Sequence, residues 1–313
     1  MKVVKPKKLK PGDLIGIVSP ASSADDYSRV EQGVKYLERI GYRVIVGENV
    51  GKYNGYLAGS DEERLSDLHK LFKNKDVKAI ICVRGGYGAN RILAKIDYKL
   101  IKANPKIFVG YSDITALQMA FLKHAGLVTF AGPMLAVDLY DDVNPYAEEF
   151  FWRILTSEKK IGKIDLPENE NLYKLTKGSS KGKLVGGNLA LITGLIGTPY
   201  LPPFKDAILF LEDIGELPYR IDRMLSQIKL SGILEETSGV ILGSFVDCNE
   251  HDPMKKTLSL GEVIDSYFGS LNIPVVYNFP HGHIPVKATL PFGINVKVNA
   301  SNETVDYNEG AVI

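Results

Sequence analysis

KIFVGYSDITALQMAFLKHA, residues 106–125, decides how the first half of this chain folds. Residues 107–109 form a short apolar run, which predicts a buried strand, and a glycine follows it. Apolar residues then recur at helical spacing as far as Ala125, and Gly126 ends that pattern. The stretch therefore predicts a strand, a tight turn that carries Ser112, and a helix.

The local sequence is compatible with two roles for Ser112. A serine between a buried strand and a helix start projects its hydroxyl over the sheet edge, beside backbone N–H groups that have no helical partner. Strained strand–serine–helix turns of this kind carry the nucleophile in some hydrolases. A serine at a helix start is also a preferred N-cap, and the local sequence favours this simpler role.

Length and composition describe an ordinary globular protein. The 313 residues correspond to one large domain or two moderate ones, with 45% hydrophobic and 24% charged residues. The 38 basic and 37 acidic side chains leave a net charge of +1, so we expect neither a nucleic-acid nor a membrane partner. Cys82 and Cys248 make no disulfide framework and no zinc spacing. The early apolar run, residues 14–18, is too short for a signal peptide, and a cytoplasmic location is expected.

Strands alternate with helices along the first half, which predicts a parallel sheet covered on both faces. The predicted strands are residues 14–18, 43–46, 77–83, 107–109 and 128–131. Parallel sheets bind ligands beyond the carboxyl ends of their strands. Ser19, the loop 84–88, Ser112 and the pair Gly132-Pro133 all fall at those ends.

Composition shifts between residues 156 and 183, where charged residues, proline, glycine and serine replace the periodic pattern. We therefore predict an N-terminal α/β domain over residues 1–157, a linker over 158–183 and a C-terminal domain over 184–313. The second half has alternating strand and helix patterns as well, with more strand than the first.

The loop Arg84-Gly85-Gly86-Tyr87-Gly88 follows a predicted buried strand. Its glycines let backbone N–H groups come close to a ligand. The loop matches neither the dinucleotide nor the P-loop motif, so nucleotide phosphate is disfavoured. Main-chain donors for an oxyanion are a better functional interpretation, and a plain glycine turn is the alternative.

A carboxylate and two histidines follow strand patterns in the second half. Glu212 closes the apolar run AILFLED, at a predicted sheet edge, where an ion pair with Arg220 or Arg223 is the alternative role. His281 and His283 flank a glycine after an apolar run. Because no third ligand stands at recognisable spacing, we expect no metal site there.

Serine, glutamate and histidine in this order compose a candidate triad. Serine becomes a nucleophile when a base accepts its proton, and the base needs a partner that fixes its tautomer. Ile114 occupies the second glycine position of the G-x-S-x-G elbow, so an ordinary esterase is disfavoured. Ser112 and His283 are 171 positions apart (283 − 112), and spacing alone does not bring them together.

Several motifs together resemble the LD-carboxypeptidase family of serine peptidases, which includes muramoyltetrapeptide carboxypeptidase and the microcin C immunity peptidase. They are YLAGSDEERLSDL (56–68), VRGGYGANRIL (83–93), FVGYSDITAL (108–117), FAGPM (130–134), GGNLALITGLIGTPY (186–200), ILFLEDIGELPYRIDRML (208–225) and GHIPVKATLPFG (282–293). The similarity runs from about residue 9 to residue 293, nearly the whole chain.

The resemblance implies a role for each member of the candidate triad. Ser112 of Gly-Tyr-Ser-Asp is the implied nucleophile, Glu212 of Leu-Glu-Asp the implied triad acid, and His283 of Gly-His the implied base; His281 is a neighbour. The implied fold is a flavodoxin-like N-terminal domain plus a smaller, swivelling α/β C-terminal domain. A homodimer is implied as well, with no cofactor.

We expect an acyl-enzyme mechanism on this basis. The N–H of Asp113 and one from Gly85 or Gly86 would bind the oxyanion, and Arg84 would attract the substrate carboxylate unless a salt bridge holds it away. The implied substrate is a murein tetrapeptide of wall recycling, which loses its terminal D-alanine. The alternatives are an immunity-type peptidase that cleaves an acyl-sulfamoyl adenylate or peptidyl-nucleotide, and a non-catalytic ligand-binding protein.

Overall fold

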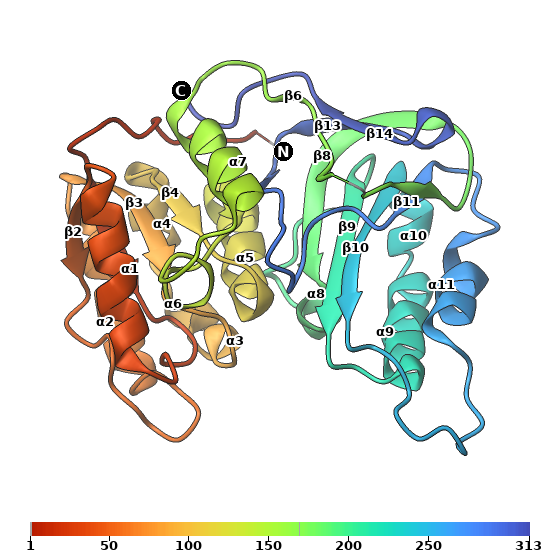
Figure 1. Cartoon of the computed structure of the whole chain (residues 1–313), viewed down its shortest axis with the longest axis horizontal. Helices are drawn as coiled ribbons and strands as arrows, with labels where there is room; N and C mark the ends of the chain where they lie inside the picture. The colour runs from red at the N-terminus through yellow and green to blue at the C-terminus, as the bar shows by residue number, and fades with distance from the viewer. Residues whose placement is uncertain (1, 169) are drawn as a thin grey trace. The chain divides into compact units, whose positions relative to one another are not determined.

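The computed structural model describes residues 2–168 and 170–313 and divides into two compact units, each with its own sheet (Figure 1). The first unit comprises Met1–Lys159, Lys287–Gly293 and Gly310–Ile313. The second comprises Lys160–Val286 and Ile294–Glu309. No helix among the described residues is long and apolar enough to cross a membrane.

The sheet of the first unit has the order β12-β5-β4-β3-β1-β2. Its strands are β1 (Leu14–Val18), β2 (Arg43–Val46), β3 (Val77–Cys82), β4 (Ile107–Val109), β5 (Thr129–Ala131) and β12 (Leu290–Phe292). Strands β1 to β5 pair in parallel, in the order 2-1-3-4-5 of flavodoxin-like folds. The predicted flavodoxin-like parallel sheet is confirmed. All five parallel strands therefore end at one edge, where the loops after β1, β3 and β4 lie.

The helices of the first unit begin and end at recognisable signals in the sequence. They are α1 (Tyr27–Arg39), α2 (Asp61–Lys73), α3 (Ala89–Ile92), η1 (Leu93–Lys95), α4 (Tyr98–Ala103), η2 (Ser112–Ile114), α5 (Thr115–Ala125), α6 (Leu135–Asp138) and α7 (Pro145–Thr156). Helix α2 starts with the predicted capping box of Ser60 and Glu63. Helix α5 ends at Gly126 in the left-handed conformation, as the sequence indicates.

A late segment of the chain completes the sheet of the first unit. Strand β12 pairs antiparallel with β5, placing Leu290 opposite Ala131 and Phe292 opposite Thr129. Both β12 residues are fully buried, so the pairing covers apolar surface as well as the backbone groups at the edge of β5. The first unit is thus discontinuous in sequence, unlike the predicted division at residue 157.

The second unit contains a sheet of order β6-β14-β13-β8-β9-β10-β11-β7. Its strands are β6 (Gly162–Lys163), β7 (Tyr173–Lys174), β8 (Ser179–Asn188), β9 (Ile208–Ile214), β10 (Gly239–Val246), β11 (Val275–Tyr277), β13 (Asn295–Asn299) and β14 (Thr304–Tyr307). Its helices are α8 (Leu189–Leu195), α9 (Pro218–Leu230), α10 (Ile233–Glu236), α11 (Leu260–Phe268) and η3 (Ala300–Asn302). Strands β8 to β11 are parallel, and antiparallel strands flank them on both sides.

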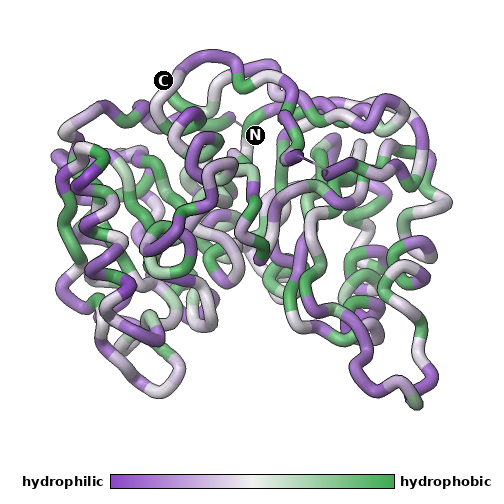
Figure 2. The backbone as a smooth tube through the Cα atoms, in the orientation of Figure 1, coloured by the Kyte–Doolittle hydropathy of each residue, from purple (hydrophilic) through white to green (hydrophobic). Residues whose placement is uncertain are grey.

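Residues 158–183, predicted as a linker, contribute β6, β7 and the first half of β8 to this sheet. Hydrophilic residues dominate this stretch of the chain (Figure 2). Apolar side chains within it are nevertheless buried, among them Ile164 and Leu172. The segment is polar because β6, β7 and the start of β8 expose most of their residues, which is why its composition resembles that of a linker.

Candidate active site

Ser112 follows β4 after two residues and opens η2, which continues directly into α5. Its φ of 62° lies in the left-handed region, which costs a residue with a Cβ about 1–2 kcal/mol. Tyr111, not Ser112, occupies the N-cap position of η2, and it makes no side-chain capping bond. The helix-cap alternative for Ser112 therefore does not hold, and the strained turn is the geometry typical of a nucleophile.

Gly85 lies directly against this serine. A Cβ added at Gly85 would stand 2.8 Å from Ser112 Cβ, 3.0 Å from its Oγ and 3.3 Å from the backbone nitrogen of Asp113. The N–H groups of Gly85 and Gly86 have no acceptor among the residues that the structure describes. The absent side chain therefore keeps open the space around the Ser112 hydroxyl and the Asp113 N–H.

Asp113 joins the Ser112 turn to the end of the glycine loop. Its carboxylate is 2% exposed, and Oδ2 accepts the Ala89 N–H at 2.7 Å, at the start of α3. Burial raises the pKa of Asp113 to about 6, although the Ala89 N–H and the Arg64 guanidinium act in the opposite direction. As the second residue of η2, Asp113 has a backbone N–H ahead of the first bond of that helix, from Ile114 N to Tyr111 O.

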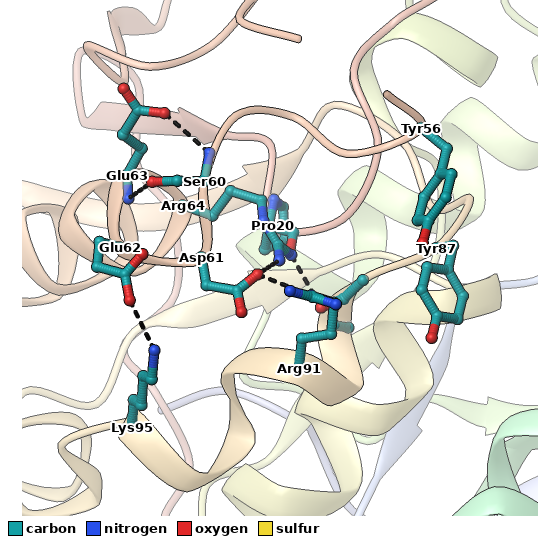
Figure 3. A network of polar contacts seen from close by, with 12 residues as sticks. Pro20, Tyr56, Ser60, Asp61, Glu62, Glu63, Arg64, Tyr87, Arg91 and Lys95 are labelled. Carbon is teal, nitrogen blue, oxygen red and sulfur yellow. Dashed lines mark hydrogen bonds and ion pairs between the residues drawn. The ribbon is translucent and has the colours of Figure 1, made fainter. Parts of the chain in front are cut away.

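Arg64, on α2, holds two of the loops at this edge (Figure 3). Its Nη1 donates to the carbonyls of Pro20 at 2.5 Å and Gly88 at 2.8 Å, and its Nη2 donates to Asp61 at 2.5 Å. The side chain is fully buried. One planar guanidinium thus fixes the loop after β1 and the loop after β3, a task suited to its forked donors.

Ser22 also connects these two loops. Its N–H donates to the Gly85 carbonyl at 3.1 Å, and its Oγ accepts the Tyr87 N–H at 3.1 Å while donating to the Tyr56 carbonyl at 2.6 Å. The rings of Tyr56 and Tyr87 meet edge to face with centroids 5.4 Å apart, and both are exposed (Figure 3). These contacts lie between the carboxyl ends of β1 and β3, where doubly wound sheets place their ligands.

Arg84, predicted as a weak substrate-binding residue, forms an ion pair. Its Nη1 lies 2.5 Å from Asp25 Oδ1. This contact is the salt-bridge alternative that the sequence left open, and it favours a role of Arg84 in holding the loops.

Glu212 and His283 contact one another within the second unit. Glu212 lies in β9, next to Asn188 of β8 in the parallel register, and is 1% exposed. Its Oε2 is 2.8 Å from His283 Nδ1. Arg220 instead pairs with Glu216 at 3.4 Å, so the alternative ion pair of Glu212 with Arg220 is not formed. A carboxylate on Nδ1 selects the imidazole tautomer that carries its proton there, and in this tautomer Nε2 is the nitrogen able to accept a proton.

Gly282 separates the two neighbouring histidines. It has a φ of 144°, and a Cβ there would stand 3.0 Å from the Ser244 carbonyl and 3.2 Å from Glu212 Oε2. His281 is 1% exposed and packs its ring edge to face on Phe210, with centroids 5.3 Å apart. The histidine that contacts the carboxylate is therefore His283, and His281 packs in the core.

Asp213 directly follows Glu212 in β9 and was not singled out from the sequence. Its carboxylate joins β9 to the end of β8 and the start of α8. Its Oδ1 accepts from the Asn188 amide and its Oδ2 from the Ala190 N–H, both at 2.9 Å. Burial raises the pKa of Asp213 to about 6, and the adjacent Glu212 charge adds to that effect. The available signal was the Glu-Asp pair closing an apolar strand.

Lys287 is a second residue that sequence reasoning missed. Its ammonium donates to Tyr111 Oη at 2.9 Å and to Asp138 Oδ1 at 2.6 Å, and it lies 4.0 Å from the centroid of the Tyr111 ring. The side chain is 1% exposed. Its signal in the sequence is one charged residue within the run IPVKATLPF, residues 284–292.

Comparisons with known proteins define the class. A sequence model of the LD-carboxypeptidase N-terminal domain matches residues 15–132, and a model of the C-terminal domain matches residues 181–298. The chain therefore belongs to the LD-carboxypeptidase family.

Among its relatives, the chain is 40% identical over 309 residues to a probable murein peptide carboxypeptidase of Bacillus subtilis (strain 168), covering 98% of this chain and 95% of that protein. The solved structure of MccF in complex with glutamyl sulfamoyl guanosine matches with a TM-score of 0.89 and 29% identity, over 99% of each chain. A muramoyltetrapeptide carboxypeptidase from Oxalobacter formigenes matches with a TM-score of 0.83 and 31% identity, over 95% of this chain and 98% of that one. The two-domain α/β fold is thus shared with solved members of the family.

Proposed function

We propose that this protein is a serine-type LD-carboxypeptidase that hydrolyses the L,D-peptide bond of murein tetrapeptides and releases terminal D-alanine. The observation that carries the proposal is the strained Ser112 turn, beside which Gly85 leaves the hydroxyl uncovered. The Glu212–His283 pair supplies the oriented base that such a serine requires. The names of the relatives support murein peptide as the substrate class.

In the proposed reaction, Ser112 Oγ attacks the scissile carbonyl while His283 Nε2 accepts its proton, and Glu212 holds the Nδ1–H of the imidazolium. The N–H of Asp113 and one from Gly85 or Gly86 bind the tetrahedral oxyanion, and each such donor lowers the barrier by about 3 kcal/mol. His283 then protonates the departing D-alanine nitrogen, which breaks the amide bond. A water molecule, activated by the same histidine, hydrolyses the acyl-serine ester and regenerates the enzyme.

A short segment of chain links His283 to Lys287. Four positions separate His283 from Lys287 (287 − 283), so their Cα atoms lie within about 14 Å of one another. Lys287 contacts Tyr111, the residue directly before Ser112. One short segment of chain therefore carries both His283 and the lysine that contacts Tyr111.

An immunity-type activity on an acyl-sulfamoyl nucleotide is the second candidate, because MccF is among the structural neighbours. Such a substrate needs an aromatic surface for its nucleobase. Trp152, the chain's one tryptophan, stacks on Tyr42 at 5.1 Å and donates its Nε1–H to Tyr36 Oη at 2.8 Å. Because these contacts engage the indole within the first unit, the murein peptide is favoured. A non-catalytic ligand-binding protein is disfavoured by the presence of all three candidate triad residues.

The proposal includes a cytoplasmic location and a homodimer, as the family resemblance implies. Light scattering of the purified protein tests the dimer directly, and a monomeric mass at micromolar concentration would contradict it.

The deciding experiment offers the protein both substrates. Wild type, Ser112→Ala and the exposed control Ser231→Ala are incubated with a murein tetrapeptide and with a glutamyl sulfamoyl adenosine, and D-alanine and sulfamoyl adenosine are quantified. We expect D-alanine release by wild type and Ser231→Ala, and a loss of about 10⁴- to 10⁶-fold in Ser112→Ala. Full release by Ser112→Ala would show that the covalent mechanism is wrong, and cleavage of the adenosine substrate alone would favour the second candidate.

A further inference from the structure

Lys287 is buried beside the residue that precedes the candidate nucleophile. The lysine is 1% exposed and donates a hydrogen bond to the hydroxyl of Tyr111 at 2.9 Å, and Tyr111 is itself 4% exposed. The same ammonium lies 4.0 Å from the centroid of the Tyr111 ring. The ring is therefore held both at its hydroxyl and at its face.

Asp138, the second partner of the Lys287 ammonium, is also held in place by a further hydrogen bond. Asp138 Oδ1 accepts from Lys287 at 2.6 Å, while its Oδ2 accepts the Met134 N–H at 3.0 Å. Asp138 closes α6, which starts directly after Met134, so the carboxylate is anchored to its own helix. Lys287 thus connects two segments of the first unit, the Tyr111 turn and α6.

A buried ion pair of this kind contributes little to stability by itself. Desolvating an ammonium and a carboxylate offsets most of their attraction, and an apolar side chain of similar volume often serves stability as well. What distinguishes this pair from an apolar contact is its directed bond to Tyr111 Oη. Ser112 follows Tyr111 at once and has the unfavourable φ of 62°, which persists only where its surroundings hold it.

We propose that Lys287 is a positioning residue for Ser112, an inference that rests on the proposed function. Its ammonium fixes Tyr111, and the fixed Tyr111 holds Ser112 in the left-handed conformation that presents its hydroxyl. Lys287 also stands four positions after His283 and three before β12. The segment that carries the base therefore ends on the group that orients the nucleophile.

The test compares Lys287→Met and Tyr111→Phe with the exposed control Lys297→Met. The measurements are kcat and KM for D-alanine release, the rate of Ser112 labelling by a fluorophosphonate, the melting temperature and the pH dependence of kcat. For Lys287→Met we expect kcat to fall about 10- to 100-fold, because small misplacements of a reacting group have effects of this size. KM stays within about 2-fold, and the labelling rate falls in parallel with kcat. The midpoint of the pH profile stays unchanged, because the base is still His283.

Tyr111→Phe removes one oxygen and nothing else, so it decides the matter even if Lys287→Met does not fold. We expect a smaller loss of kcat and labelling, and the double variant should be no slower than Lys287→Met, because the two residues act through one bond. Wild-type kcat and labelling in folded Lys287→Met or in Tyr111→Phe would overturn the inference, as would a rise in KM at constant kcat. A wild-type protein that neither takes up the probe nor releases D-alanine would instead contradict the proposed function.

Discussion

The Ser112 turn in the first unit and the Glu212–His283 pair in the second are braced alike. Ser112 and Glu212 are each followed at once by a buried aspartate, Asp113 and Asp213 respectively. Both aspartates accept a backbone N–H from the first turn of a helix, α3 in one unit and α8 in the other. Burial raises the pKa of each to about 6. The two units thus use the same local arrangement, a buried aspartate that accepts a backbone N–H from the start of a helix.

They differ in what holds the functional side chain itself. Glu212 lies within a strand between two parallel neighbours, so backbone hydrogen bonds fix its position. Ser112 lies outside any strand, in an unfavourable backbone conformation, packed against Gly85 and directly after Tyr111, which Lys287 contacts. The difference shows that Glu212, the candidate triad acid, is positioned by the sheet, whereas Ser112, the candidate nucleophile, is positioned by the packing around a turn.

The largest loss of activity is expected from a change at Glu212, the residue that contacts His283. Glu212→Gln keeps the shape of the side chain, but a neutral amide neither stabilises the imidazolium nor selects the correct tautomer of His283. We expect kcat for D-alanine release to fall about 10⁴-fold with little change in melting temperature. Glu216→Gln, which removes the partner of Arg220, is the matched control and should retain activity. Near-normal turnover in Glu212→Gln would mean that another group orients the base.

Gly85→Ala probes the packing around the nucleophile. The new methyl group would press on Ser112 Cβ at 2.8 Å and crowd the Asp113 nitrogen at 3.3 Å. We expect kcat to fall about 10²- to 10³-fold, the size of losing one oxyanion donor, as measured in D-alanine release assays.

Gly261→Ala is the control, because Gly261 is exposed in α11 and a Cβ there meets only Ser259 Oγ, at 4.0 Å. This variant should be fully active and slightly more stable, since alanine favours a helix over glycine. Equal activity of the two alanine variants would show that the space beside Ser112 is not used by a substrate.

The smallest effect concerns stability, and it tests whether the two aspartates are equivalent. Their folded-state pKa of about 6 is above the ordinary value of 3.8, so the native state binds these protons more tightly than the unfolded chain does. The free energy of unfolding therefore falls as the pH rises from about 4 to about 6. Asp113→Asn or Asp213→Asn should remove up to about 3 kcal/mol of this fall, so that each variant gains stability relative to wild type across that window.

Denaturant unfolding between pH 4 and pH 7 measures this effect, with the exposed Asp252→Asn as control. If the difference in free energy of unfolding between variant and wild type stayed constant with pH, a raised pKa of the aspartate would be contradicted. An effect at only one of the two positions would show that the units are braced differently.

Local features of the fold were predictable because neighbouring residues determine them. The capping box of Ser60 and Glu63, and the helix that ends at Gly126, follow from a few adjacent side chains. Strand β12 was not predictable, because Leu290–Phe292 contains a proline and pairs with residues about 160 positions earlier. Proline is compatible with β12 as an edge strand, but its partner cannot be read from local sequence.

The residues of the candidate site also differ in whether local sequence predicts them. Ser112, Glu212 and His283 were predicted from motifs, and the structure shows the contact of Glu212 with His283 within the second unit. Lys287 and Arg64 were missed, because a charged residue in a helix or loop reads as exposed until tertiary contacts bury it. Their roles depend on loops that only the folded chain brings together.

Strand β12 has a consequence for how the protein is made. The partner edge of β5 is synthesised by residue 131, whereas β12 is complete only at residue 292, which is 161 residues later (292 − 131). At a synthesis rate of about 5–20 residues per second, roughly 10–30 s pass between the synthesis of β5 and that of β12, which pairs with its edge. During that interval the nascent sheet exposes an unpaired, apolar strand edge of the kind that chaperones recognise and that aggregates when left uncovered.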